Sequence, residues 1–192
     1  MSFIFINYWN YNASPQKVRR KLEQRLLKQE ERFAEIAADT ALLSDLISNG
    51  NNIAKTELVK ESFGLFVYQT SNGESPVLTY WNTNQLYVGP DDLYRRDSNY
   101  FVQSQNGQFE LIKQRVELKS GPVILLAMLP VRWSYFMENK YLHSDFAGHP
   151  GLDNQYEISS DAAAMPVVSS KGNELFRVQL KQGKRFISYD TS

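Results

Sequence analysis

One short run of the chain is rich in side chains that could do chemistry. It holds four residues of the types that bind metals, His143, Asp145, His149 and Asp153. Their spacing matches no common ligand pattern, so ordinary polar surface is the favoured interpretation. Glu138 and Asp145 could act as the carboxylate pair of a hydrolase, but nothing in the sequence indicates that they converge. The chain has no Cys and none of the common catalytic motifs, so we predict no catalytic residue, no metal and no cofactor.

A second group of residues has the composition of a small-ligand pocket, with aromatic walls and a few polar groups. Its members are Trp81, Asn82, Tyr87, Arg132, Trp133, Tyr135, Asn139 and Tyr141. For each residue taken alone, a place in the core or in a cross-strand pair is more common than a place in a site. As a set, however, they suggest a binding site. The predicted ligand-binding residues are Trp81, Asn82, Arg132, Tyr135, Asn139 and Tyr141.

The segments that carry these aromatic residues have the two-residue period of strands. We predict an antiparallel sheet of about five strands with Gly- and Asn-containing hairpin turns, and further short strands after it. The last long strand, 123–135, is apolar at consecutive positions through Leu129, so we expect it to be central and covered on both faces. A short helix is expected from Glu138 to Phe146. The predicted strands are 65–69, 77–81, 100–104, 109–119 and 123–135, with shorter ones in QYEIS, MPVVS and ELFRVQL.

A long charged helix is predicted before the sheet. Ser14-Pro15 suits a helix start, and neither Gly nor Pro follows until Asn49-Gly50. Apolar residues recur at spacings of four and three from Val18 to Ile47, as in the seam of a coiled coil, with polar Gln29 and Thr40 among them. Charged residues flank this stripe in the first half, and alanines and leucines widen it in the second. We therefore expect the first half to project and pair with a second copy.

The residues before this helix have a membrane-like character. FIFINYWNY (3–11) is too short to span a bilayer, but an aliphatic run that ends in aromatics is typical of a transmembrane helix at the interface. A hydrophobic strand of the domain is the alternative, and the basic cluster from Lys17 to Lys21 counts against the membrane interpretation. The chain carries 21 Lys and Arg against 21 Asp and Glu. This neutral balance argues against a general nucleic-acid binder.

A helix that emerges from a membrane before an antiparallel sheet resembles the PAS-like or Cache-like extracytoplasmic sensor domains of bacterial receptors. PVRWSYFMENKYLHSDFA (130–147) is similar to a segment of Bacteroidetes-type sensor histidine kinases, in which a strand ends in Tyr before Glu-Asn-x-Tyr-Leu and an aromatic residue. VLTYWN (77–82) and GNELFRVQL (172–180) resemble two further strands of these proteins. The matching positions in the first segment are Tyr135, Glu138, Asn139, Tyr141, Leu142 and Phe146.

The resemblance implies an α+β fold in which the long N-terminal helix packs on a PAS-like or Cache-like antiparallel sheet with short helical insertions. It divides the chain into a membrane-proximal remnant (1–13), a signalling and dimerisation helix (14–49) and a sensor domain (50–192). The implied function is periplasmic, non-catalytic sensing of a small-molecule or protein signal by a membrane-anchored homodimer. A conformational change would pass along the helix to the membrane. A membrane-anchored hydrolase using Glu138 or Asp145, a protein-binding scaffold, and the input domain of a chemoreceptor or cyclic-dinucleotide enzyme remain alternatives.

Overall fold

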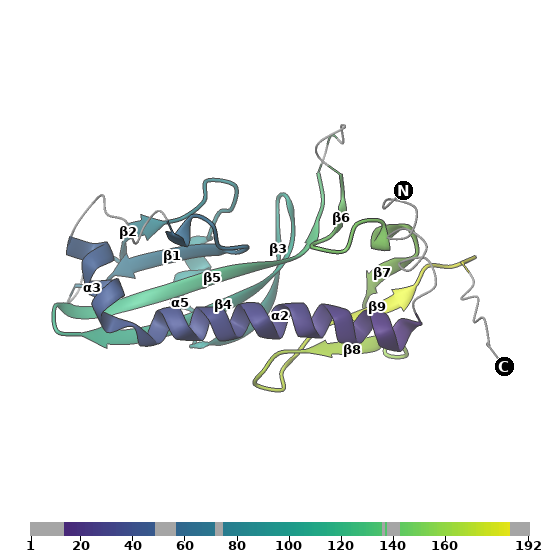
Figure 1. Ribbon diagram of the computed structural model, residues 1–192, viewed down its shortest axis with the longest axis horizontal. Helices are drawn as coiled ribbons and strands as arrows, with labels where there is room; N and C mark the ends of the chain where they lie inside the picture. Colours follow the sequence, from purple (N-terminus) through teal and green to yellow (C-terminus); the bar gives the residue numbers. More distant parts are fainter. Residues whose placement is uncertain (1–13, 49–56, 72–74, 136, 138–142, 185–192) are drawn as a thin grey trace. The chain divides into compact units, whose positions relative to one another are not determined.

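A computed structural model describes residues 14–48, 57–71, 75–135, 137 and 143–184 (Figure 1). The fold is α+β, with an N-terminal helix, an antiparallel sheet of six strands and a smaller sheet of three. The helices are α2 (Pro15–Ala38), α3 (Thr40–Ser48) and α5 (Pro90–Tyr94), with a 3₁₀ turn at Leu152–Asn154. The strands are β1 (Gly64–Gln69), β2 (Val77–Trp81), β3 (Ser98–Ser104), β4 (Gly107–Leu118), β5 (Gly121–Trp133), β6 (Asp145–Phe146), β7 (Tyr156–Ser159), β8 (Met165–Val168) and β9 (Glu174–Leu180).

The chain forms two compact units. Unit 1 comprises Met1–Leu27, Gln105–Gln108 and Pro130–Ser192, and unit 2 comprises Lys28–Ser104 and Phe109–Leu129. Helix α2 and strand β5 therefore contribute residues to both units. The expected domain boundary after residue 13 and the one after residue 49 both fall at segments outside the described residues.

The larger sheet has the strand order β2-β1-β5-β4-β3, and β6 pairs with the far end of β5 (Figure 1). β5 is central because its run from Val123 to Val131 is apolar at every position and fully buried. Its antiparallel register with β1 sets Leu65 opposite Ala127. The prediction of a long central strand is confirmed, although β5 ends at Trp133, two residues earlier than expected.

The smaller sheet lies in unit 1 and has the order β7-β9-β8. The predicted short strands of the C-terminal third are thereby confirmed. Ile158 and Met165 both pair with Val178 of the central strand β9, and the Val178 side chain is fully buried. The sequence alone did not indicate that these strands form a separate sheet.

The single helix predicted for 14–49 is wrong, because Asp39 separates α2 from α3. The Asp39 side chain accepts a hydrogen bond from the N–H of Leu42 at 2.9 Å, as an N-cap does. The N–H of Asp39 turns back to the carbonyl of Ile36 at 3.2 Å, which closes α2 with a tighter turn. The apolar spacing continues across this break, so periodicity could not reveal it.

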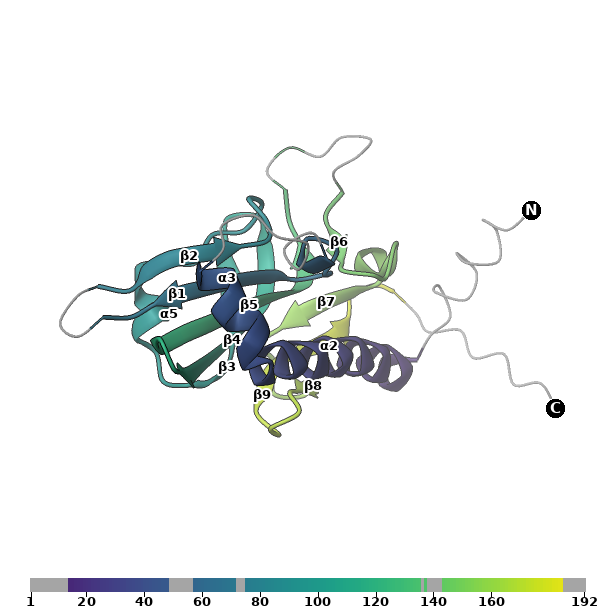
Figure 2. The same ribbon diagram turned by 60° about the vertical axis from the view of Figure 1, so that its left-hand side comes forward.

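The first half of α2 does not project from the body, which corrects a second expectation. Val18, Leu22 and Leu26 are only 1–3% exposed within the single chain. The N–H of Val168, in β8, donates to Glu23 at 3.3 Å, and α2 lies beside β8 in both views (Figures 1 and 2). The first part of the apolar stripe, which we expected to pair with a second copy, is therefore buried within the single chain.

In the region expected to be a helix, Glu138 to Phe146, the structure describes residues 143–146. There, Asp145 and Phe146 form strand β6, paired with Trp133 and Arg132. The N-terminal segment expected to be membrane-proximal lies outside the described residues. Within the described residues, no helix is long and apolar enough to cross a membrane.

Candidate functional site

An open apolar groove of about 220 Å³ lies in unit 2, between the edge of the large sheet and the chain that follows β2. We call it the β2 groove. Trp81 and Tyr87 stand at its mouth with 48% and 71% of their surfaces exposed, which is unusual for aromatic side chains of this size. The residues that line it are Phe66, Tyr68, Leu78, Trp81, Thr83, Asn84, Leu86, Tyr87 and Val88.

The side chain of Asn82, which lies in sequence between the groove residues Trp81 and Thr83, bonds to the backbone of unit 2. Its oxygen accepts the N–H of Leu65 at 2.7 Å, and its NH₂ group donates to the carbonyls of Leu58 and Phe63 at 2.9 and 3.0 Å. Three backbone groups of residues 58–65 thus meet at one amide. Asn82 is a positioning residue, with its hydrogen-bonding capacity directed to the fold.

Two further contacts set the walls of the groove. The indole N–H of Trp81 donates to Asn84 at 2.6 Å, which holds the ring at the mouth. Gly64 allows the other wall to approach, because a Cβ there would lie 2.7 Å from the Leu86 side chain. A side chain at residue 64 would therefore force the Leu86 side chain to shift.

Tyr68 supplies a polar group to an otherwise apolar wall. Burial raises the pKa of its hydroxyl, and the nearby Tyr87 and Asp92 raise it further. Tyr68 therefore stays protonated at neutral pH and can donate or accept a hydrogen bond. The groove combines flat aromatic surfaces with a few neutral polar groups, and its described lining residues include no pair of ionised groups for acid–base chemistry.

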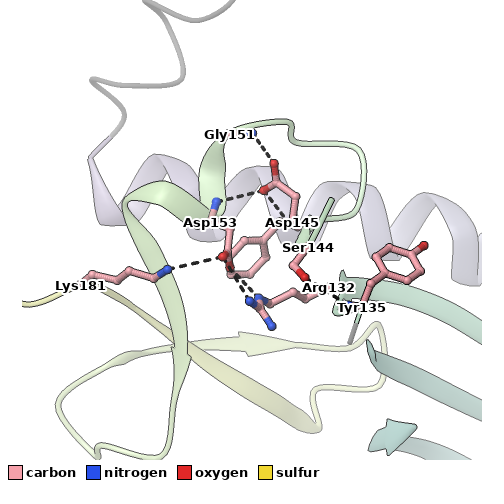
Figure 3. A network of polar contacts seen from close by, with 8 residues as sticks. Arg132, Tyr135, Ser144, Asp145, Gly151, Asp153 and Lys181 are labelled. Atoms are coloured by element: carbon pink, nitrogen blue, oxygen red, sulfur yellow. Dashed lines mark hydrogen bonds and ion pairs between the residues drawn. The ribbon is translucent and has the colours of Figure 1, made fainter. Parts of the chain in front are cut away.

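A second cavity, of about 520 Å³, lies in unit 1 beside the chain from 143 to 154. Next to it is the polar network of Figure 3, in which Arg132 and Lys181 both point at the carboxylate of Asp153. Arg132 makes two hydrogen bonds to Asp153, at 2.5 and 3.1 Å, and Lys181 lies at 3.4 Å. Burial alone would raise the pKa of Asp153, but these two cations outweigh it and hold the pKa below its usual range.

Asp145 organises the loop beside that cavity (Figure 3). Its carboxylate accepts the N–H groups of Phe146 at 2.8 Å, of Asp153 at 3.0 Å and of Gly151. These three hydrogen bonds tie the backbone at residues 146, 151 and 153 to one side chain. The arrangement suits loop stabilisation better than proton transfer to a substrate. No group of three or more His, Asp or Glu residues within the described chain could hold a metal ion.

The structure distributes the predicted ligand residues over two units. Trp81 lines the β2 groove and Asn82 supports it, whereas Arg132 is bound in the ion pair with Asp153. Tyr135 stacks on Trp133, with ring centroids 6.1 Å apart and planes 7° from parallel. Asn139 and Tyr141 lie outside the described residues.

Several groove residues were not among the predicted site residues. Phe66 and Tyr68 were predicted only as alternate positions of the strand 65–69, while Leu86 and Val88 lie in a stretch with no regular period. The alternation of Phe66 and Tyr68 places them on one face of β1. This alternation was the sequence feature that could have identified them. It does not indicate which face of β1 is covered by the chain after β2.

Comparison of the chain with known protein families, with curated proteins and with solved structures gave no match.

Proposed function

We propose that this chain is a ligand-binding input domain, the extracytoplasmic part of a membrane-anchored bacterial receptor of the PAS-like or Cache-like kind. The observation that carries the proposal is the β2 groove, where half-exposed Trp81 and exposed Tyr87 flank an apolar floor with a protonated Tyr68. A concave aromatic surface with few polar groups is the usual form of a small-molecule site.

The topology of unit 2 supports the same proposal by fold-level analogy. An antiparallel sheet of order β2-β1-β5-β4-β3 after an N-terminal helix fits a PAS-like or Cache-like domain. The β2–β3 connection supplies one wall of the groove, as residues 83–88 show. A sensor histidine kinase is the proposed whole protein; a chemoreceptor or a cyclic-dinucleotide enzyme would need the same kind of input domain.

The ligand is small and has a flat apolar face. The groove holds about 220 Å³, less than the roughly 300–1,000 Å³ of pockets for drug-sized ligands. A single aromatic or sugar ring that stacks on Trp81 and bonds to Tyr68 fits this description. The proposed role is non-catalytic, because Asp145 and Asp153 are both fully engaged in structural hydrogen bonds and ion pairs.

We propose that the signal passes along α2. This helix contributes to both units, and in unit 2 the Gln29 side chain donates to the hydroxyl and carbonyl of Ser62 at 2.8 and 3.2 Å. A ligand that binds two arrangements of unit 2 unequally would shift their populations and move this helix. The homodimer through α2 stays a prediction, but its seam must be revised, because Val18, Leu22 and Leu26 are already buried within one chain.

A thermal-shift screen tests the ligand site. Indole, L-phenylalanine, tyramine and glucose are suitable probes of ring stacking. At a hundred times its Kd, a ligand stabilises the folded chain by about 2.7 kcal/mol, which raises Tm by roughly 5–10 °C for a domain of this size. Trp81→Ala should abolish the shift. Tyr94→Ala removes an exposed aromatic outside the groove and should leave the shift intact. A shift unaffected by Trp81→Ala would refute the proposed site.

A further inference from the structure

The N-terminal half of α2 carries a row of exposed cations. Between Pro15 and Leu27 the helix has five basic residues, Lys17, Arg19, Arg20, Lys21 and Arg25, and one acidic residue, Glu23. Because Val18, Leu22 and Leu26 are buried, the helix is fixed in rotation and its opposite side faces outward. Lys17, Arg20 and Lys21 lie on that outward side at helical spacing and are exposed, and we call them the basic face.

The basic face differs from the other basic residues of this helix in the hydrogen bonds and ion pairs of its side chains. Arg19 lies 3.6 Å from Glu23, and Arg25 donates to the carbonyl of Pro130 at 2.6 Å. The side chains of Lys17, Arg20 and Lys21 make no ion pair or hydrogen bond with any part of the chain that the structure describes. Lys28 continues the same row and is exposed too.

Helix stability does not explain these cations. Positive charges near a helix N-terminus oppose the helix dipole, and α2 has no acidic residue in its first turn to balance them. Like charges three and four residues apart on a helix also repel one another. Lys17 stands in this relation to both Arg20 and Lys21. An external anion would relieve both effects.

We propose that the basic face binds an anionic membrane surface through its phosphate headgroups. Lipid is the favoured polyanion because Lys17 follows within six residues of Tyr11, the end of the aromatic segment assigned to a membrane interface. In this respect the inference rests on the proposed function. Nucleic acid is disfavoured, since the whole chain has 21 basic and 21 acidic residues. The contact would hold the outward side of α2 against the bilayer from which the receptor emerges.

The expected strength of membrane binding follows from the contribution of each basic residue. Each Lys or Arg close to an anionic membrane contributes about 1 kcal/mol, or roughly a fivefold increase in binding. Three cations together therefore account for about a hundredfold increase in binding to the anionic membrane. Such binding is reversible and weakens strongly with salt, because exposed charges are screened within a Debye length of about 10 Å at 0.1 M.

Vesicle co-sedimentation of the full chain tests the proposal. The probes are phosphatidylcholine vesicles with and without phosphatidylglycerol, at low and at high ionic strength. We expect stronger binding to the anionic vesicles, lost at high salt, and reduced about a hundredfold by K17Q/R20Q/K21Q. The matched control R96Q/K119Q/K171Q removes three exposed positive charges from other segments and should bind like the unmodified chain.

Equal binding to neutral and anionic vesicles would overturn the proposal. So would equal losses in the two triple variants, or binding to a DNA duplex as tight as that to the anionic vesicles. Folding of each variant is checked by its Tm. The ligand screen contains no vesicles, so a failure of the β2 groove and a failure of the basic face are separate outcomes.

Discussion

At the scale of single residues, Asn82 ties the chain after β2 to the segment that leads into β1. Its side chain joins Leu65, Leu58 and Phe63 through three backbone hydrogen bonds. We predict that Asn82→Ala lowers the free energy of unfolding by about 2–4 kcal/mol, because backbone groups inside unit 2 lose their partners. Urea denaturation measures the change.

Asn84→Ala is the matched control for Asn82→Ala. It removes one exposed hydrogen bond, from the indole of Trp81, and should cost less than about 1 kcal/mol. Similar losses of unfolding free energy in the two variants would show that Asn82 does not organise the groove.

His149 is the residue from which we expect a pH response. Its Nε2 atom is buried and has no hydrogen-bond partner within the described chain. Burial lowers the pKa of His149, as do Arg25 and Lys21 of α2, while Asp145 and a hydrogen bond to the backbone of Lys21 act in the opposite direction. The folded chain therefore favours the neutral imidazole.

This shift fixes the sign of the pH dependence. The unfolded chain binds the His149 proton more tightly than the folded one, so the stabilisation is complete above a pH of about 6.5 and declines as the pH falls below it. We predict that unfolding free energy decreases between pH 7.5 and 5 and that His149→Gln flattens this slope. His143→Gln, at an exposed position, should leave the slope unchanged; the reverse pattern would contradict the role of His149.

At the scale of elements, the break between α2 and α3 rests on Asp39. We predict that Asp39→Ala destabilises the chain by about 1 kcal/mol through loss of the cap on α3, measured by thermal unfolding. Asp39→Ser keeps a capping oxygen and should retain most of the stability. If Asp39→Ala were as stable as the unmodified chain, the cap would not be what ends one helix and begins the next.

Strands were easier to predict from this sequence than helix boundaries and packing partners. The run from Val123 to Leu129 can only be a buried strand or a buried helix. The turn residues before it favoured a strand, and this prediction is confirmed. The break at Asp39 has no Gly or Pro to mark it. The stripe from Val18 to Leu26 was read correctly as apolar, but a pattern on one helix cannot say whether its partner is another chain or a sheet formed more than a hundred residues later.

The candidate site was predictable from the sequence only as a group of aromatic and polar residues. Trp81 belongs to that group and lines the β2 groove. Asn82 was found for the wrong role, since its amide serves the fold. Arg132 and Tyr135 belong to unit 1, and sequence proximity to Trp133 gave no indication of the ion pair or the stacking that engages them.

At the scale of the whole molecule, the proposed ligand site and the proposed membrane contact belong to different units. The β2 groove lies in unit 2 and the basic face in unit 1. Helix α2 contributes to both units, which makes it the proposed route for the signal. Ligand binding should therefore alter the salt-sensitive vesicle binding of the full chain, because two sites that act on one helix are coupled reciprocally.

The measurement closest to the central claim is a ligand titration followed by the indole N–H signals of the chain's three tryptophans in ¹H–¹⁵N spectra. A Trp81→Phe variant assigns the signal of Trp81. With a compound that raises Tm, we predict that this signal moves in proportion to occupancy, while that of Trp133 stays in place. Movement of the Trp133 signal alone would place the ligand in unit 1 and contradict the β2 groove as the binding site.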